Sequence, residues 1–157
     1  MFRSFFKTSQ TLKAIRNELD EVKTLAAQPL IHRLHSGEQL SHLREAEFKV
    51  FSQFGDDGVI QYLIHRLHPL PDSFVEFGVE NYRESNTRFL LLNNNWRGLV
   101  MDSDEDSIRY IQKDDVSWRH TLAAHCAFIN GDNINDLLAE AGFTGKIGLL
   151  SIDIDGK

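Results

Sequence analysis

The stretch SFVEFGVENYRESNTRFLLLNNNWRGLVMDSD, residues 73–104, decides the fold of this chain. Its first part, 73–79, is an apolar, β-prone run that predicts a buried strand, and the polar residues after it end that strand with turn and capping chemistry. Residues 88–95 have helical spacing, and 98–101 form a second apolar strand that stops at Asp102. A strand, a helix and a strand in this order predict one βαβ unit of a parallel sheet.

The same alternation of strands and helices continues to the end of the chain. The sequence predicts strands over 73–79, 98–102, 121–129 and 147–154, and helices over 59–67, 85–95, 104–113 and 133–141. Apolar strands separated by helices are typical of an α/β fold, a parallel sheet with both faces covered. Asp104 and Asn133 are expected to cap two of the helices, and Gly142 to end the last one.

Residues 1–45 form a helical extension that differs from the pattern of residues 46–157. Apolar residues recur there three or four positions apart, as in an amphipathic helix with a near-heptad repeat: Leu12, Ile15, Leu19, Val22 and Ala26. Pro29 is expected to end this helix. The repeat is shorter than the roughly three to four heptads of a coiled coil. We therefore favour packing of this face on the helix's own domain over a seam between two copies.

Composition and charge exclude several functional classes. Of the 157 residues, 41% are hydrophobic and 11 are Phe, enough for a core, which argues against global disorder. A net charge of −6 without a run of Lys or Arg argues against nucleic-acid binding. No segment approaches the ~18 apolar residues that span a membrane, and the N-terminus lacks the apolar core of a secretion signal. We expect a cytoplasmic protein.

The single cysteine and the histidines near the N-terminus do not predict a metal site. Cys126 lies in an apolar stretch and is expected to be buried rather than reactive. His32, His35 and His42 have no Cys or carboxylate at metal-ligand spacing, so we expect them at the surface or at an interface.

Asp102 is the leading candidate for ligand binding. Open parallel sheets bind ligands at the carboxyl ends of their strands, and an acid roughly 20 residues after a turn glycine accepts hydrogen bonds from ribose hydroxyls. Gly78 supplies that turn, since glycine allows close backbone approach and a positive φ. Helix capping is the alternative for Asp102, although Ser103 and Asp104 are better placed for it. Glu76 is expected either to bind a ligand amine or to cap the turn.

Three further sets of polar residues lie near the predicted strand ends. Asp132 and Asn133 follow the third strand and either contact a base or cap a helix. Asp153 and Asp155 lie on the same side of the fourth strand, where a carboxylate acts as a general base or, less favoured, binds a divalent cation. Gln53 lies in a polar loop before a helix, which is either a lid or an N-capping loop.

The predicted turn lacks the glycine-rich fingerprint of a pyrophosphate site. Only one of the glycines of the G-x-G-x-x-G pattern is present, at Gly78. Acidic residues dominate the predicted loops, so a ligand with bare phosphates is disfavoured. A nucleoside that carries a positive or zwitterionic group fits better.

Four segments together resemble the FkbM-like class I S-adenosylmethionine-dependent methyltransferases: FKVFSQFGDDG, FVEFGVENYRESNTRFLL, NNNWRGLVMD and GLLSIDIDG. More narrowly, they are similar to a branch found among bacterial surface-polysaccharide genes. The resemblance covers about residues 46–157. It implies a Rossmann-like sheet, S-adenosyl-L-methionine as cofactor, and methyl transfer to a hydroxyl of a glycan or another small acceptor.

The resemblance also implies roles for individual residues. Asp102 would hold the ribose, Asp132 and Asn133 would lie near the adenine, and Asp153 would mark the catalytic end of the fourth strand. The residues expected to bind the cofactor are Gln53, Glu76, Gly78, Asn86, Asp102, Asp132 and Asn133, and the expected catalytic acids are Asp153 and Asp155; no metal ligand is expected.

The chain stops at Lys157, directly after the fourth predicted strand. Native proteins avoid an unprotected apolar edge strand, so we expect residues 46–157 to be the N-terminal part of a longer methyltransferase domain. Two alternatives stay open. One is a nicotinamide-dependent oxidoreductase, which the missing fingerprint glycines disfavour. The other is a truncated, non-catalytic remnant or an assembly module, including a homo-oligomer formed through the N-terminal helix.

Overall fold

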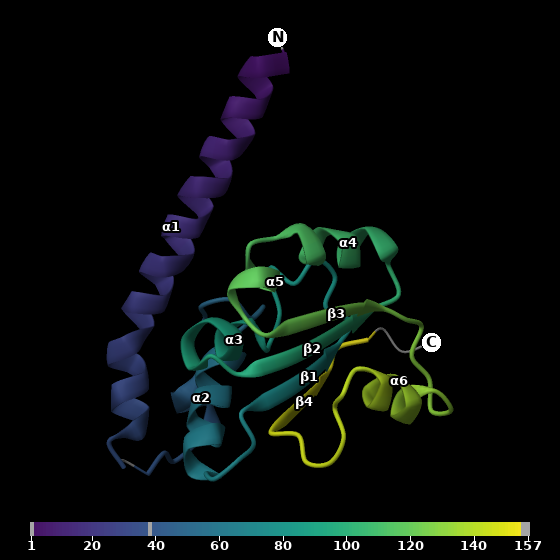
Figure 1. Ribbon diagram of the computed structural model, residues 1–157. Helices are drawn as coiled ribbons and strands as arrows, with labels where there is room; N and C mark the ends of the chain where they lie inside the picture. The colour runs from purple at the N-terminus through teal and green to yellow at the C-terminus, as the bar shows by residue number, and fades with distance from the viewer. Residues whose placement is uncertain (1, 38, 155–157) are drawn as a thin grey trace.

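A parallel β-sheet with helices on both faces forms the body of the molecule (Figure 1). The computed structural model describes residues 2–37 and 39–154. In chain order the elements are α1 (Phe2–His35), η1 (Leu43–Ala46), α2 (Asp56–Arg66), β1 (Ser73–Phe77), α3 (Arg88–Asn94), β2 (Arg97–Asp102), α4 (Glu105–Lys113), α5 (Val116–Arg119), β3 (Leu122–Cys126), α6 (Ile134–Glu140) and β4 (Leu149–Ile152). The predicted α/β fold, with a Rossmann-like sheet of four strands after an N-terminal helix, is confirmed.

The strands lie in the order β3-β2-β1-β4, and all neighbours are parallel. Val75 of β1 pairs with Leu99 of β2 on one side and with Leu150 of β4 on the other. Along the chain, β2 and β3 are therefore added on one side of β1, and β4 is then added on the other side of β1. Such a change of direction opens a crevice at the carboxyl ends of the strands.

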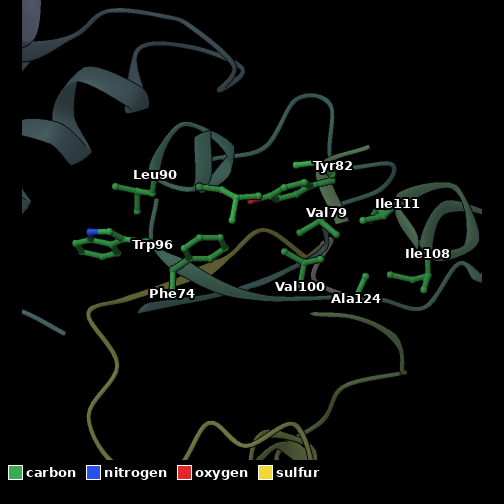
Figure 2. Packing of buried hydrophobic residues seen from close by; sticks show 11 residues of the cluster. Phe74, Val79, Tyr82, Leu90, Trp96, Val100, Ile108, Ile111 and Ala124 are labelled. Atoms are coloured by element: carbon green, nitrogen blue, oxygen red, sulfur yellow. The ribbon is translucent and has the colours of Figure 1, made fainter. Parts of the chain in front are cut away.

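Two apolar cores cover the faces of this sheet. Phe74 and Val100 lie on the face covered by α2, α3, α4 and α5, where they pack with Leu90 and its neighbours (Figure 2). Val75 and Leu99 point to the opposite face, which α6 covers (Figure 1). All five side chains are fully buried. Successive strand residues point to opposite faces, so strands buried on both sides are apolar almost throughout.

Several elements are shorter than predicted: β1 ends at Phe77, and β4 covers only Leu149–Ile152. The helix expected from residue 85 begins at Arg88, because Ser85 and Thr87 instead donate hydrogen bonds to the buried carboxylate of Glu76. The third strand ends at Cys126, and the residues after it form a loop. The short helix α5 was not predicted.

Cys126 is exposed, so the expectation that it is buried is wrong. It ends β3, which is an edge strand with a neighbour on one side only. The apolar run around it predicted a fully covered strand. The sheet order decides instead that this strand lies at the margin, where fewer side chains cover it.

The N-terminal helix continues through Pro29 to His35, so the prediction that Pro29 ends it is wrong. Proline removes the hydrogen bond to the carbonyl four residues earlier, here that of Leu25. Leu25 is exposed, so the missing hydrogen bond lies on a side of the helix that faces solvent rather than the core. Residues on both sides of Pro29 are buried against the sheet domain and stabilise the continued helix: Ala27, Ile31 and Leu34.

The apolar face from which the N-terminal helix was predicted points away from the domain. Four of its side chains are between 53% and 59% exposed: Leu12, Ile15, Leu19 and Val22. The favoured expectation, that this face packs on the helix's own domain, is therefore wrong. In this N-terminal part, polar contacts attach the helix, such as the ion pair of 2.8 Å between Lys13 Nζ and Asp115 Oδ1; apolar packing attaches it only further along, around Ala27 and Ile31. No helix in the described part of the chain has the length and apolar composition needed to cross a membrane.

Candidate functional site

A cleft of about 540 Å³ lies at the carboxyl ends of all four strands. Gly78 follows β1, Asp102 ends β2, Ala127 follows β3 and Asp153 follows β4, and all four line the cleft. Gln53 lines it from the loop before α2. The cleft thus brings together four of the predicted site residues at the place where parallel sheets bind ligands.

Gly78 is required by the close approach of the chain after β1 to the chain after β4. Its φ of +74° confirms the expected left-handed turn. A Cβ atom added here would overlap the backbone carbonyl of Asp153. Backbone hydrogen bonds of 3.0 Å extend the parallel ladders on both sides of this turn, from Gly78 to the Met101 carbonyl and from Asp153 to the Phe77 carbonyl. The glycine therefore lets the turn after β1 lie directly against the end of β4.

The carboxylate of Asp102 is held by two backbone groups and keeps capacity for a ligand. Oδ2 accepts from the N–H of Glu80 at 2.8 Å, and Oδ1 accepts from the N–H of Asp104 at 2.9 Å. Each carboxylate oxygen has a second lone pair, so two hydroxyl groups can still donate to this side chain. Asp104 caps α4 by accepting from the N–H of Ser107, as predicted, so capping does not explain Asp102.

The loop after Gly78 is fixed in an unusual backbone conformation. Glu80 and Tyr82 both have a positive φ, of 46° and 61°, which is uncommon outside glycine. The turn at Glu80 directs its N–H to Asp102. The Tyr82 side chain is fully buried, its hydroxyl lies 3.2 Å from Thr87 Oγ1, and burial raises its pKa. The buried tyrosine anchors the loop and keeps Asp102 in place.

Glu76 lies beneath the cleft and does not line it. Only 1% of the residue is exposed, and its carboxylate accepts hydrogen bonds from the Ser85 and Thr87 hydroxyls and from the N–H groups of Asn86 and Thr87. Ser151 of β4 donates a further bond at 3.2 Å. This arrangement matches the capping alternative for Glu76. Asn86 also lies outside the cleft lining, where its Nδ2 donates to Ser151 Oγ at 3.3 Å.

Asp132 and Asn133 lie in the loop between β3 and α6, outside the cleft lining. Asn133 occupies the predicted cap position without making a capping hydrogen bond. Its side chain accepts from the N–H of Asn130 at 2.9 Å and donates to the Phe128 carbonyl at 2.8 Å. The asparagine thereby shapes the loop that carries Phe128 into the cleft. Phe128 is 77% exposed and was not predicted, although an aromatic residue just after a strand offers a face for stacking.

A buried carboxylate orders the loop that contains Gln53. Asp57 Oδ2 accepts from three successive backbone N–H groups, ending with that of Ser52, and from the Ser52 hydroxyl. Lys49 Nζ donates to the Gln53 carbonyl and pairs with Glu84, both at 2.9 Å. Lys49 therefore links this loop to Glu84, which also lines the cleft.

The charged side chains among the described residues that line the cleft are all acidic. Glu80, Glu84, Asp102 and Asp153 contribute carboxylates, and no Lys, Arg or His belongs to the described lining. The field of these groups attracts a cation and opposes a phosphate. Asp155 lies outside the described residues. Nowhere between residues 2 and 154, apart from residue 38, do three His, Cys, Asp or Glu side chains gather to hold a metal ion.

No family model, curated protein or solved structure matches this chain. The resemblance to the FkbM-like methyltransferases stays a prediction from the quoted segments. Arguments about function accordingly depend on the cleft and its side chains.

Proposed function

We propose that the cleft binds S-adenosyl-L-methionine and that the protein transfers its methyl group to a hydroxyl of a glycan or another small acceptor. The observation that supports this most is the placement of Asp102. Its carboxylate ends β2 in the cleft, is held by two backbone N–H groups, and retains one lone pair on each oxygen. A vicinal diol is the group that matches two free acceptor sites on one carboxylate.

The charge of the cleft supports a sulfonium donor. Glu84 is paired with Lys49, but the carboxylates of Glu80, Asp102 and Asp153 favour a cation, and the neutral thioether product would be held less strongly and would leave more easily. Phe128 provides an aromatic face for the adenine beside the end of β3.

The methyl transfer itself requires little covalent chemistry from the protein. A sulfonium supplies an activated methyl group, so the chain has to align the acceptor oxygen with that group and exclude water. As the oxygen–carbon bond forms, the carbon–sulfur electron pair goes to sulfur and the hydroxyl proton goes to a base. Asp153, which lines the cleft at the end of β4, is our candidate for that base, with Asp155 as the second predicted acid.

A nicotinamide-dependent oxidoreductase is less well supported. It would use the same acid for ribose, but its cofactor carries a pyrophosphate, and the described lining offers no basic side chain to receive one. We place the activity in the cytoplasm, because the exposed thiol of Cys126 fits a reducing compartment.

Titration calorimetry with S-adenosylhomocysteine tests the proposal. We expect binding to the unaltered chain and a roughly 10- to 100-fold weaker affinity in Asp102→Ala, because a hydrogen bond to a charged group contributes about 1.5–3 kcal/mol. The matched control is Asp106→Ala, an exposed acid on α4 that should leave affinity unchanged. Thermal melting of each variant checks that it is folded.

Two results would contradict the proposal. One is the absence of binding to the unaltered chain, and the other is an equal affinity in Asp102→Ala. Protection against melting by NAD, without protection by S-adenosylhomocysteine, would favour the oxidoreductase instead.

A further inference from the structure

The stripe of α1, which we define as Leu12, Ile15, Leu19 and Val22, is a continuous apolar surface open to solvent. Each of the four side chains is more than half exposed, and the neighbouring Leu25 is 70% exposed. Single exposed apolar residues are ordinary on protein surfaces, but a contiguous row of them marks an interaction site.

The stripe has the geometry of a coiled-coil seam. Its residues are three, four and three positions apart, as the a and d positions of a heptad are. Three contacts of α1 with its own domain come from b positions, which lie away from the seam: Lys13, Asp20 and Ala27. Lys23, at an e position beside the seam, also reaches the domain through the Val50 carbonyl. The described residues of the domain therefore leave the seam uncovered.

We propose that the stripe binds the same stripe of a second copy of this chain in a parallel coiled coil. A seam that repeats as a heptad is complementary to itself, as a symmetric interface requires. The N-terminal half of α1 projects beyond the sheet domain (Figure 1). Two copies can thus bring their stripes together while their domains, attached to the opposite side of each helix, remain outside.

Charges beside the stripe favour the parallel orientation. Arg16 and Lys23 occupy e positions on one side of the seam, and Glu18 occupies a g position on the other. In a parallel pair, Glu18 faces Lys23 of the second copy. An antiparallel pair would place basic residues opposite each other. Lys23 donates to the Val50 carbonyl at 3.0 Å, and its ammonium group keeps two further donors.

Light scattering coupled to size-exclusion chromatography tests the association. We expect the unaltered chain to have a mass of two or more chains, and Leu19→Glu to have the mass of one. Leu67→Glu is the matched control, because Leu67 is an equally large, 61% exposed side chain at the end of α2. It should leave the mass unchanged. Circular dichroism confirms folding, and Ile15→Glu provides a second substitution in the stripe.

Three outcomes would overturn the proposal. These are a single-chain mass for the unaltered protein, an equal effect of Leu67→Glu, and large aggregates that Leu19→Glu does not disperse. Flotation of a single-chain protein with anionic vesicles would assign the stripe to a membrane surface and would also overturn it.

Disulfide cross-linking tests the orientation. In a Cys126→Ser background, Leu12→Cys places a thiol at an a position, where parallel copies bring equivalent residues together. Oxidation should produce a covalent dimer on a non-reducing gel. Ala14→Cys, an exposed position on the same helix but off the seam, is the control and should cross-link far less. Equal yields, or no product from Leu12→Cys, would contradict a parallel seam.

Discussion

The sheet and α1 use their apolar residues in opposite ways. In β1 and β2 the apolar side chains are buried on both faces of the sheet. Polar side chains line the cleft only where the strands end. In α1 the apolar stripe faces solvent, and charged side chains attach this part of the helix to the domain, while apolar packing is confined to the stretch around Ala27 and Ile31. Both segments have clear hydrophobic periodicity. The difference shows that periodicity identifies an apolar face without identifying the surface that covers it.

The largest expected effect on stability tests the packing at the strand ends of the sheet. Gly78→Ala should lower the free energy of unfolding by roughly 3–5 kcal/mol, because the methyl group strains a left-handed turn and overlaps the Asp153 backbone. Gly142→Ala is the control, with a φ of +75° and open space around it, and should cost about 1 kcal/mol. Urea unfolding measures both. Equal losses would show that the approach of Gly78 to the Asp153 backbone is not tight.

A second prediction compares one leucine from each region. Leu99→Ala in β2 should cost about 3 kcal/mol, since it leaves a cavity in a fully buried site. Leu19→Ala on the stripe should change stability by less than about 0.5 kcal/mol. Both are measured by urea unfolding in an Ile15→Glu background, which prevents self-association from stabilising the helix. A large loss in Leu19→Ala would mean that the stripe does pack on its own domain.

The charged attachment of α1 gives a smaller expected effect. Asp20 Oδ2 lies 3.6 Å from Arg88 and 3.8 Å from Arg83. Arg88 is buried, and burial lowers the pKa of its guanidinium, so the counter-charge of Asp20 matters. Asp20→Asn should cost about 1–2 kcal/mol in urea unfolding. Asp106→Asn, which breaks an exposed pair with Arg109, should cost less than about 0.5 kcal/mol. Similar costs would argue against a charge-based attachment.

The smallest expected effect is a pH dependence at the contact between α1 and α2. The rings of His35 and His65 stack with centroids 4.0 Å apart. Burial first, and then the charge of His65, lower the pKa of His35 below its ordinary 6.5. The unfolded chain therefore takes up a proton that the folded protein resists, and stability falls as pH drops through about 6.5.

His35→Phe removes this titration and keeps a stacked ring. Between pH 7 and pH 5.5, the free energy of unfolding of His35→Phe should fall less than that of the unaltered chain. Urea unfolding at each pH measures both. His120, whose pKa burial also lowers, should leave a residual slope in both proteins. Parallel curves for the two proteins would exclude His35 as a source of the pH dependence.

Local patterns in the sequence predicted much of the fold and part of the candidate site. The strands around Val75 and Leu99, the left-handed turn at Gly78 and the cap at Asp104 depend on neighbours within a few residues. Asp102 was predicted to lie in a cleft because the end of a parallel strand is a ligand-binding position in this fold class.

Other features depended on residues far apart in the chain and were left open, predicted wrongly or not predicted. Glu76 is enclosed by donors from its own turn and from Ser151, so it does not reach the cleft. Phe128 enters the cleft only because Asn133 folds its loop back. Cys126 is exposed because β3 lies at the margin of the sheet.

By itself, the sequence determined which segments are strands and helices, where the tight turn falls, and which side of each element is apolar. These properties follow from local backbone preferences and side-chain spacing. Only the tertiary structure decided which apolar faces are covered, which strands lie at the edges, and which acids reach the cleft. Those outcomes depend on how elements distant in the chain pair and pack, and a one-dimensional pattern does not contain that information.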